Sequence, residues 1–179
     1  MMISKLLYFL ERKNFLSDLR KNKKSIISNN IKIGKYISYI ISKSSFIEIG
    51  NNVSIRNNFN LVTGNNAVLE IADGVFINNN CSINCLEKII IGENTLLGEG
   101  VKIYDHNHQY SNEKIEHQKF NTSPIIIEKN CWIGSNVVIL KGVNIGSNSI
   151  IGAGCVIHKN IPENSIIINH QNLETKQYK

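Results

Sequence analysis

Aliphatic residues recur every six positions along most of the chain, and this period predicts its fold. The steps of six restart after longer connections and place aliphatics at Ile49, Ile55, Leu61, Ile71, Ile77, Ile83, Ile91, Leu97, Ile103, Ile127, Ile133, Ile139, Ile145, Ile151 and Ile157. An amphipathic helix has a period of about 3.6 and an alternating strand a period of about 2, so neither explains the pattern. Three steps of six form one unit, which indicates a repeat architecture.

The third residue after each aliphatic is usually Asn or Gly, the residues that best tolerate φ > 0. These are Asn52, Asn58, Gly64, Gly74, Asn80, Asn94, Gly100, Asn130, Asn136, Gly142, Asn148, Gly154 and Asn160, and only Leu86 and His106 break the series. A backbone corner must therefore recur every six residues, between short strands. Three such sides close a triangular coil, and stacked coils bury the aliphatic column while parallel strands pair from coil to coil.

The chain divides into three parts on this basis. We predict an all-β solenoid over residues 46–168, a basic helical segment over residues 1–45 and a tail over residues 169–179. Within the first part, residues 1–24 have helical spacing of apolar side chains among many lysines and arginines. We expect this helix to cap the open end of the solenoid. The alternative is a basic amphipathic helix that touches an anionic membrane.

Composition and charge narrow the class of protein. With 42% hydrophobic and 19% charged residues the chain can bury a core, and its 179 residues suit one domain. The net charge of +6 divides into +8 over residues 1–45 and −2 over the remainder. Because the basic residues gather on a terminal segment and not on a folded face, we expect no nucleic-acid partner. Apolar runs are too short for a membrane span, so we predict a cytoplasmic protein, with the inner membrane face as an alternative location.

Three of the four cysteines are assigned to packing positions by the repeat. Cys81, Cys131 and Cys155 occupy a small inward or corner-flanking position of the repeat, one residue after each corner. No CxxC pair is present, and the chain lacks export features. We therefore expect packing roles and reduced thiols, with neither disulfides nor a metal site.

One excursion interrupts the repeat. It covers residues 104–124, opens with Tyr104, Asp105, His106, Asn107 and His108, and ends at Pro124. Loops that leave a rigid scaffold often carry function. The two histidines also stand at a corner that abandons the Asn/Gly rule, so this segment is the candidate for chemistry.

Two runs of the repeat resemble the hexapeptide-repeat acyltransferases, a family with a left-handed parallel β-helix. They are Ile133-Gly-Ser-Asn-Val-Val138 and Ile151-Gly-Ala-Gly-Cys-Val156, and the resemblance covers about residues 47–168. The excursion is similar to that of the sugar O-acetyltransferases in this family, the galactoside, maltose and capsule-modifying enzymes. In that group a histidine opens the loop, a proline ends it and a tryptophan follows, as His108, Pro124 and Trp132 do here.

The resemblance implies a site, a cosubstrate and an assembly. His108 is the expected general base, with His106 in reserve, and the Ser135 backbone N–H is the expected oxyanion donor. Acceptor binding is assigned to Asn78, Asp105 and Trp132, and acetyl-CoA binding to Ser135, Ala153 and Lys159. For Asp105 the alternatives are a role in orienting an imidazole and that of a solvated loop carboxylate. The long polar excursion and the three-sided coil also predict a homotrimer whose sites lie between subunits.

These expectations together predict an acetyl-CoA-dependent O-acetyltransferase that acts on a sugar, as part of a surface polysaccharide or its precursor. Asn84 and Leu86 stand where galactoside enzymes place an acidic residue, so a simple galactoside acceptor is not expected. One alternative is an N-acetyltransferase of a nucleotide-linked amino sugar, whose relatives usually lack the long excursion. Two others are a zinc enzyme of the carbonic-anhydrase type with His106, His108 and His117 as ligands, and a non-catalytic scaffold.

Overall fold

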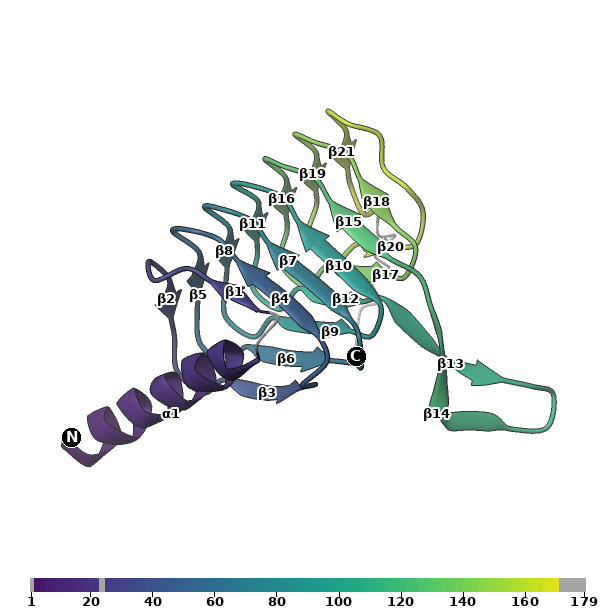
Figure 1. The fold of residues 1–179 in the computed structure, drawn as a ribbon. Helices are drawn as coiled ribbons and strands as arrows, with labels where there is room; N and C mark the ends of the chain where they lie inside the picture. Colours follow the sequence, from purple (N-terminus) through teal and green to yellow (C-terminus); the bar gives the residue numbers. More distant parts are fainter. Residues whose placement is uncertain (1, 23–24, 171–179) are drawn as a thin grey trace, which may run out of the picture.

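The chain folds into a parallel β-solenoid of six complete coils, with one helix at its N-terminal end (Figure 1). The computed structural model describes residues 2–22 and 25–170, and leaves aside the side chains of residues 2–9 and 11. Each coil contributes one short strand to each of three parallel sheets, so that the coil is triangular in cross-section. The predicted left-handed parallel β-helix is confirmed.

The three sheets are numbered in the order in which the chain visits them. The first sheet contains β1 (Ile26–Ile27), β4 (Phe46–Ile49), β7 (Val68–Ile71), β10 (Lys88–Ile91), β15 (Ile125–Ile127) and β18 (Asn144–Ile145). The second contains β2 (Lys32–Ile33), β5 (Ser54–Ile55), β8 (Phe76–Ile77), β11 (Leu96–Leu97), β16 (Trp132–Ile133), β19 (Ile150–Ile151) and β21 (Ile166–Ile167). The third contains β3 (Ser38–Ile41), β6 (Asn60–Thr63), β9 (Ser82–Cys85), β12 (Lys102–Tyr104), β17 (Val138–Leu140) and β20 (Val156–Ile157).

The core is the column of aliphatic side chains that the sequence predicts. All fifteen predicted aliphatics are at most 5% exposed, and each lies above its counterpart in the coil below. All four cysteines are also buried as free thiols. Burial raises the pKa of Cys81, Cys131 and Cys155, as expected for packing residues that remain protonated.

The left-handed corners follow a rule that depends on which corner of the coil they occupy. Among the predicted Asn and Gly residues, every one at the corner between the first and second sheets, or between the second and third, has positive φ. At the third corner, where one coil passes to the next, only Gly142 does, whereas Gly64 and Asn160 do not. The third corners differ in length from coil to coil, so a fixed offset from the aliphatic residue no longer identifies the turning residue.

The solenoid begins one coil earlier than the sequence predicted. Strands β1, β2 and β3 lie in register on β4, β5 and β6, so residues 26–41 form the first coil and do not belong to the helical segment. The signal is weak because Tyr36 replaces Asn or Gly at a corner, with φ of 60°. At the other end, β21 begins a seventh coil, and residues 171–179 of the predicted tail lie outside the described residues.

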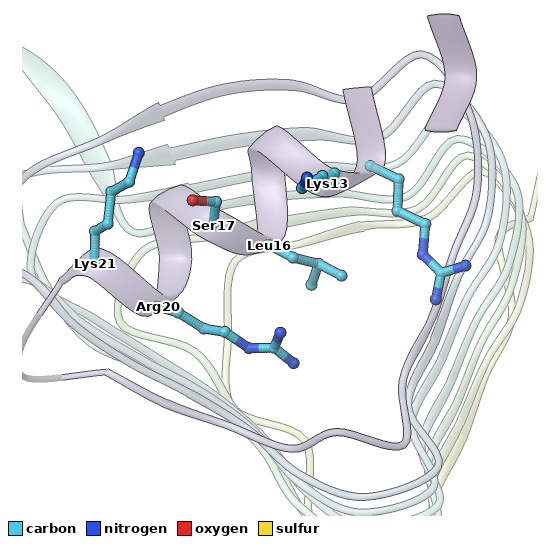
Figure 2. A pocket seen from close by; sticks show the side chains of 6 residues that line it. Lys13, Leu16, Ser17, Arg20 and Lys21 are labelled. Atoms are coloured by element: carbon cyan, nitrogen blue, oxygen red, sulfur yellow. The ribbon is translucent and has the colours of Figure 1, made fainter. Parts of the chain in front are cut away.

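Helix α1 (Met2–Lys21) caps the open N-terminal end of the stack, as expected. Phe15 and Leu19 are fully buried in the solenoid core, and the Phe15 ring lies 5.0 Å from that of Tyr39 in the first coil. Figure 2 views the helix across the triangular end of the coils, beside a hollow lined by Arg12, Lys13, Leu16, Ser17, Arg20 and Lys21.

In the part of the chain that the structure describes, no helix is long and apolar enough to cross a membrane.

An antiparallel hairpin leaves the stack between the fourth and fifth coils. It consists of β13 (His106–Tyr110) and β14 (Ile115–Thr122), and it projects away from the solenoid on the side of the third corner (Figure 1). The excursion over residues 104–124 therefore has regular structure of its own.

Gly142 provides a test of the corner geometry, because its φ is +79°. Gly142→Val places a β-branched residue in this conformation, which should cost about 1–3 kcal/mol of stability. Gly142→Asn is the matched control, since Asn adopts the left-handed conformation at nine other corners. Thermal unfolding should show a loss of several degrees for the valine variant and a smaller loss for asparagine. Equal melting of the two variants would contradict the assigned backbone conformation.

Candidate functional site

The hairpin presents two histidines whose ring orientations are fixed by hydrogen bonds. In His108, Nδ1 lies 3.0 Å from the Glu116 carbonyl oxygen on the opposite strand. A carbonyl oxygen only accepts hydrogen bonds, so Nδ1 must carry the proton. In the neutral imidazole, Nε2 then carries the lone pair. The His108 side chain is exposed, so the sequence expectation that it acts as a base is compatible with its position.

His106 has a different environment. Its Nδ1 lies 3.2 Å from Asp105 Oδ1, and its side chain is only 15% exposed. This contact also favours the tautomer with Nδ1 protonated. His106 therefore resembles the oriented imidazole of an Asp–His pair, but it is less accessible than His108.

Phe120 lies between the two histidines, a role that the sequence did not reveal. Its ring centroid is 5.1 Å from that of His106, edge to face, and 4.7 Å from that of His108. Aromatic contacts in this range are favourable. Only the antiparallel register, which pairs His108 with Phe120, brings these rings together, and the linear pattern of the excursion carries no such signal.

Asp105 belongs to the scaffold, which corrects two of the roles considered from the sequence. Its side chain is fully buried, and its carboxylate accepts hydrogen bonds from the backbone N–H groups of Leu86, Glu87 and Lys88. It is therefore not a solvated loop carboxylate, and within this chain it has no open face for an acceptor sugar. The third role considered, orienting an imidazole, fits its contact with His106.

The remaining predicted residues lie on other parts of the coil. Asn78, Ser135 and Ala153 are at the corner between the second and third sheets, in the third, fifth and sixth coils, and Trp132 lies in the second sheet. Trp132 is 54% exposed.

The Ser135 N–H has no partner among the described residues, as an oxyanion donor requires. The Ser135 carbonyl accepts a hydrogen bond from the N–H of Gly154, the residue after Ala153. Asn78 is half-buried, and its Oδ1 accepts from the Asn79 N–H.

The structure thus separates the predicted site into two groups. The histidines are at the third corner, and Lys159 is exposed at the same corner two coils further along. The second sheet is the side of the triangle opposite the third corner, so strand β16, which contains Trp132, and the hairpin lie on different sides of the coil (Figure 1). Within one chain, His108 and the residues expected to bind the acceptor and the thioester do not form a single cleft. No three His, Cys, Asp or Glu side chains gather as possible metal ligands in the described part of the chain.

Comparison with known proteins agrees with this architecture. Residues 124–159 match the family described as the hexapeptide repeat of succinyl-transferase. A comparison with curated protein sequences gives no match.

Several solved structures share the fold. A hexapeptide-repeat acetyltransferase of Vibrio cholerae, crystallised with acetyl-CoA, is 23% identical with a TM-score of 0.54, over 87% of this chain and 71% of that one. The polysialic acid O-acetyltransferase OatWY is 25% identical with a TM-score of 0.52, over 86% and 90% of the two chains. An N-acyltransferase of Bacillus cereus, AntD, bound to an amino-sugar nucleotide and coenzyme A, is 16% identical with a TM-score of 0.56, over 86% and 84%.

The six-residue period, the three parallel sheets and these similarities lead to one conclusion. The chain has the left-handed parallel β-helix fold, and its residues 124–159 are similar to the hexapeptide repeat of succinyl-transferase.

Proposed function

We propose that the protein is an acetyl-CoA-dependent O-acetyltransferase that acts on a sugar hydroxyl, within a surface polysaccharide or its precursor. The observation that carries the proposal is the exposed imidazole of His108, whose Nδ1 is fixed by the Glu116 carbonyl and whose Nε2 has no hydrogen-bond partner among the described residues. Two similar structures support the acyl donor and the acceptor class, since one was crystallised with acetyl-CoA and the other is a polysialic acid O-acetyltransferase.

The chemistry needs a base, an oxyanion donor and a leaving thiol. His108 Nε2 takes the proton of the sugar hydroxyl as its oxygen attacks the thioester carbonyl carbon. The Ser135 N–H donates a hydrogen bond to the oxygen that becomes negative in the tetrahedral intermediate. The carbon–sulfur bond then breaks, and the proton held by His108 passes to the departing thiolate, which gives CoA and the acetyl ester.

The acetyl-CoA arm is proposed to run along the corner that carries Ser135 and Ala153, with Lys159 of another subunit available to a phosphate. Trp132 and Asn78 lie on the same side of the coil and would form the acceptor wall. An N-acyltransferase acting on an amino-sugar nucleotide is the second candidate, because AntD has the same fold. An acceptor panel that contains both hydroxyl and amino sugars separates the two.

The catalytic prediction concerns the base. His108→Ala should lower turnover of acetyl-CoA by about 10²- to 10⁴-fold, the range expected for a lost general base. Binding of acetyl-CoA should change little, since His108 is assigned to the acceptor hydroxyl. A thiol-release assay against the acceptor panel measures turnover, and calorimetry measures binding.

His117→Ala is the matched control, because His117 is exposed on the same hairpin. It should keep the parental rate. A fully active His108→Ala variant would transfer the role to His106 or refute the mechanism, and loss of activity in His117→Ala would favour a metal site.

The separation of the two groups of residues supports a homotrimer with composite sites. An isolated two-stranded hairpin is marginally stable in water, and this one has exposed Tyr110 and Ile115, 79% and 63% accessible, towards its tip. From the third coil onwards, the second sheet also carries an outward row of apolar residues: Phe76, Leu96, Trp132, Ile150 and Ile166. Such a row usually marks an interaction surface. A closed ring of three would bring the hairpin of one subunit to the Trp132 side of the next.

The assembly can be tested in two steps. Light scattering should give three times the chain mass of 20.2 kDa. Co-expression of His108→Ala with Trp132→Arg, each inactive alone, should restore about a quarter of the parental activity, because about one interface in four combines both intact sides. Absence of any recovery, or a fully active monomer, would refute the composite site.

A further inference from the structure

Asp105 makes an unusual set of contacts for one carboxylate. Its oxygens lie 2.8 and 3.0 Å from the Leu86 nitrogen, 2.7 Å from that of Glu87 and 3.0 Å from that of Lys88. The same carboxylate lies 3.2 Å from His106 Nδ1. Three consecutive backbone donors and one imidazole therefore share a side chain that has no exposed surface.

These contacts lie at the two corners where the expected Asn or Gly is replaced by Leu86 and by His106. Leu86 and His106 occupy third corners that are adjacent along the stack, and neither has positive φ. At the corner of residues 86–88, the Asp105 side chain satisfies backbone donors that face the interior. At the corner between the first and second sheets in the second to sixth coils, Asn or Gly with positive φ makes the turn without burying a charge. A buried carboxylate is costly unless it is fully paired, so its presence here indicates a further task.

That task is visible at the root of the hairpin. The Asp105 carbonyl accepts from the Ser123 N–H at 2.9 Å, which closes the two strands where they rejoin the coil. From the carboxylate, contacts pass to the His106 ring, then to Phe120, then to His108. Each ring in this series rests on the one before it.

We propose that Asp105 is a positioning residue for His108: it locks the hairpin to the coil and, through His106 and Phe120, sets the orientation of the His108 ring. The inference rests on the proposed function, in which His108 Nε2 is the base. Asp105 itself touches no reacting atom. His106 serves as the link between the buried carboxylate and the hairpin, and it takes no proton from the substrate.

The first experiment compares turnover and binding in three variants. Asp105→Asn should lower kcat by about 10- to 100-fold, since small misplacement of a base has effects of this size, and should leave KM for acetyl-CoA within about twofold. His106→Phe, which keeps an aromatic ring against Phe120, should give a smaller loss. Asp73→Asn should leave both constants unchanged, because Asp73 caps an exposed corner at the Asn51 nitrogen, on another part of the coil.

Two outcomes of this comparison would overturn the proposal. If the folded Asp105→Asn variant keeps the kcat of the parent, then Asp105 does no more than satisfy the backbone donors of residues 86–88. A loss in His106→Phe as large as that in His108→Ala would make His106 a catalytic residue.

The second experiment does not depend on acetyl transfer. Nitrogen NMR of the neutral imidazoles should show His106 and His108 with Nδ1 protonated in the parent. In Asp105→Asn, both rings should move towards a mixture of tautomers, whereas Asp73→Asn should keep the parental spectrum. An unchanged His108 signal in Asp105→Asn would refute the positioning role even if no acceptor is known. If the tautomers shift as expected but the parent transfers no acetyl group, the proposed function fails and the structural link remains.

Stability against pH provides a third measurement. Burial alone would raise the pKa of Asp105, but hydrogen bonds from His106 and from the Leu86 and Glu87 amides outweigh it, so that the pKa lies below its usual value of 3.8. The nearby Cys85 thiol is neutral, because burial and the Asp105 charge both raise its pKa. A carboxylate with a lowered folded pKa stabilises the protein above its unfolded pKa, and this contribution is lost as pH falls through the folded value.

The difference in Tm between the parent and Asp105→Asn should therefore be large at pH 7 and shrink below about pH 4. Asp73→Asn should show a smaller difference at every pH. A pH-independent difference for Asp105→Asn would show that the charge of Asp105 is not what holds the corner and the His106 ring.

Discussion

The vertical registry of equivalent side chains is the constraint on which this molecule depends. Each coil buries its aliphatic residues only because the coil above and the coil below present the same positions at the same place. Registry in turn requires that the first and second corners turn after the same number of residues in every coil. Asn and Gly meet this requirement, and asparagine side chains such as Asn130 and Asn148 also hydrogen-bond to each other along the stack.

This constraint does not apply to the third corner, and it is there that the coils differ from one another in length and structure. Extra residues can be placed there without disturbing the next strand, because the chain has already completed one coil. The hairpin with His106 and His108 leaves at this corner, and the neighbouring corner of residues 86–88 is closed by Asp105 and not by a left-handed residue. Regularity at two corners therefore permits variation at the third.

The sequence predicts the regular part of the structure well and the irregular part poorly, for the same physical reason. A side chain that repeats its environment every coil, such as Ile139, is recognisable from its spacing alone. The first coil was missed because Tyr36 stands at a corner where Asn or Gly was expected. The resemblance identifies His108 as the candidate base, but the contact of His108 with Phe120 depends on a hairpin register that has no period. Asp105 could not be assigned to the interior, because the amides that it binds belong to a coil visited about twenty residues earlier.

The position of the hairpin within the stack has a consequence for its motion. In a solenoid each coil contacts only its neighbours, so local opening starts at the ends and becomes less frequent towards the middle. Helix α1 covers one end, while the hairpin leaves the solenoid between the fourth and fifth coils and has two complete coils, the fifth and the sixth, beyond it. Fraying of the terminal coils therefore leaves the strands that hold the hairpin paired, and the two histidines are anchored in the part of the solenoid that opens last.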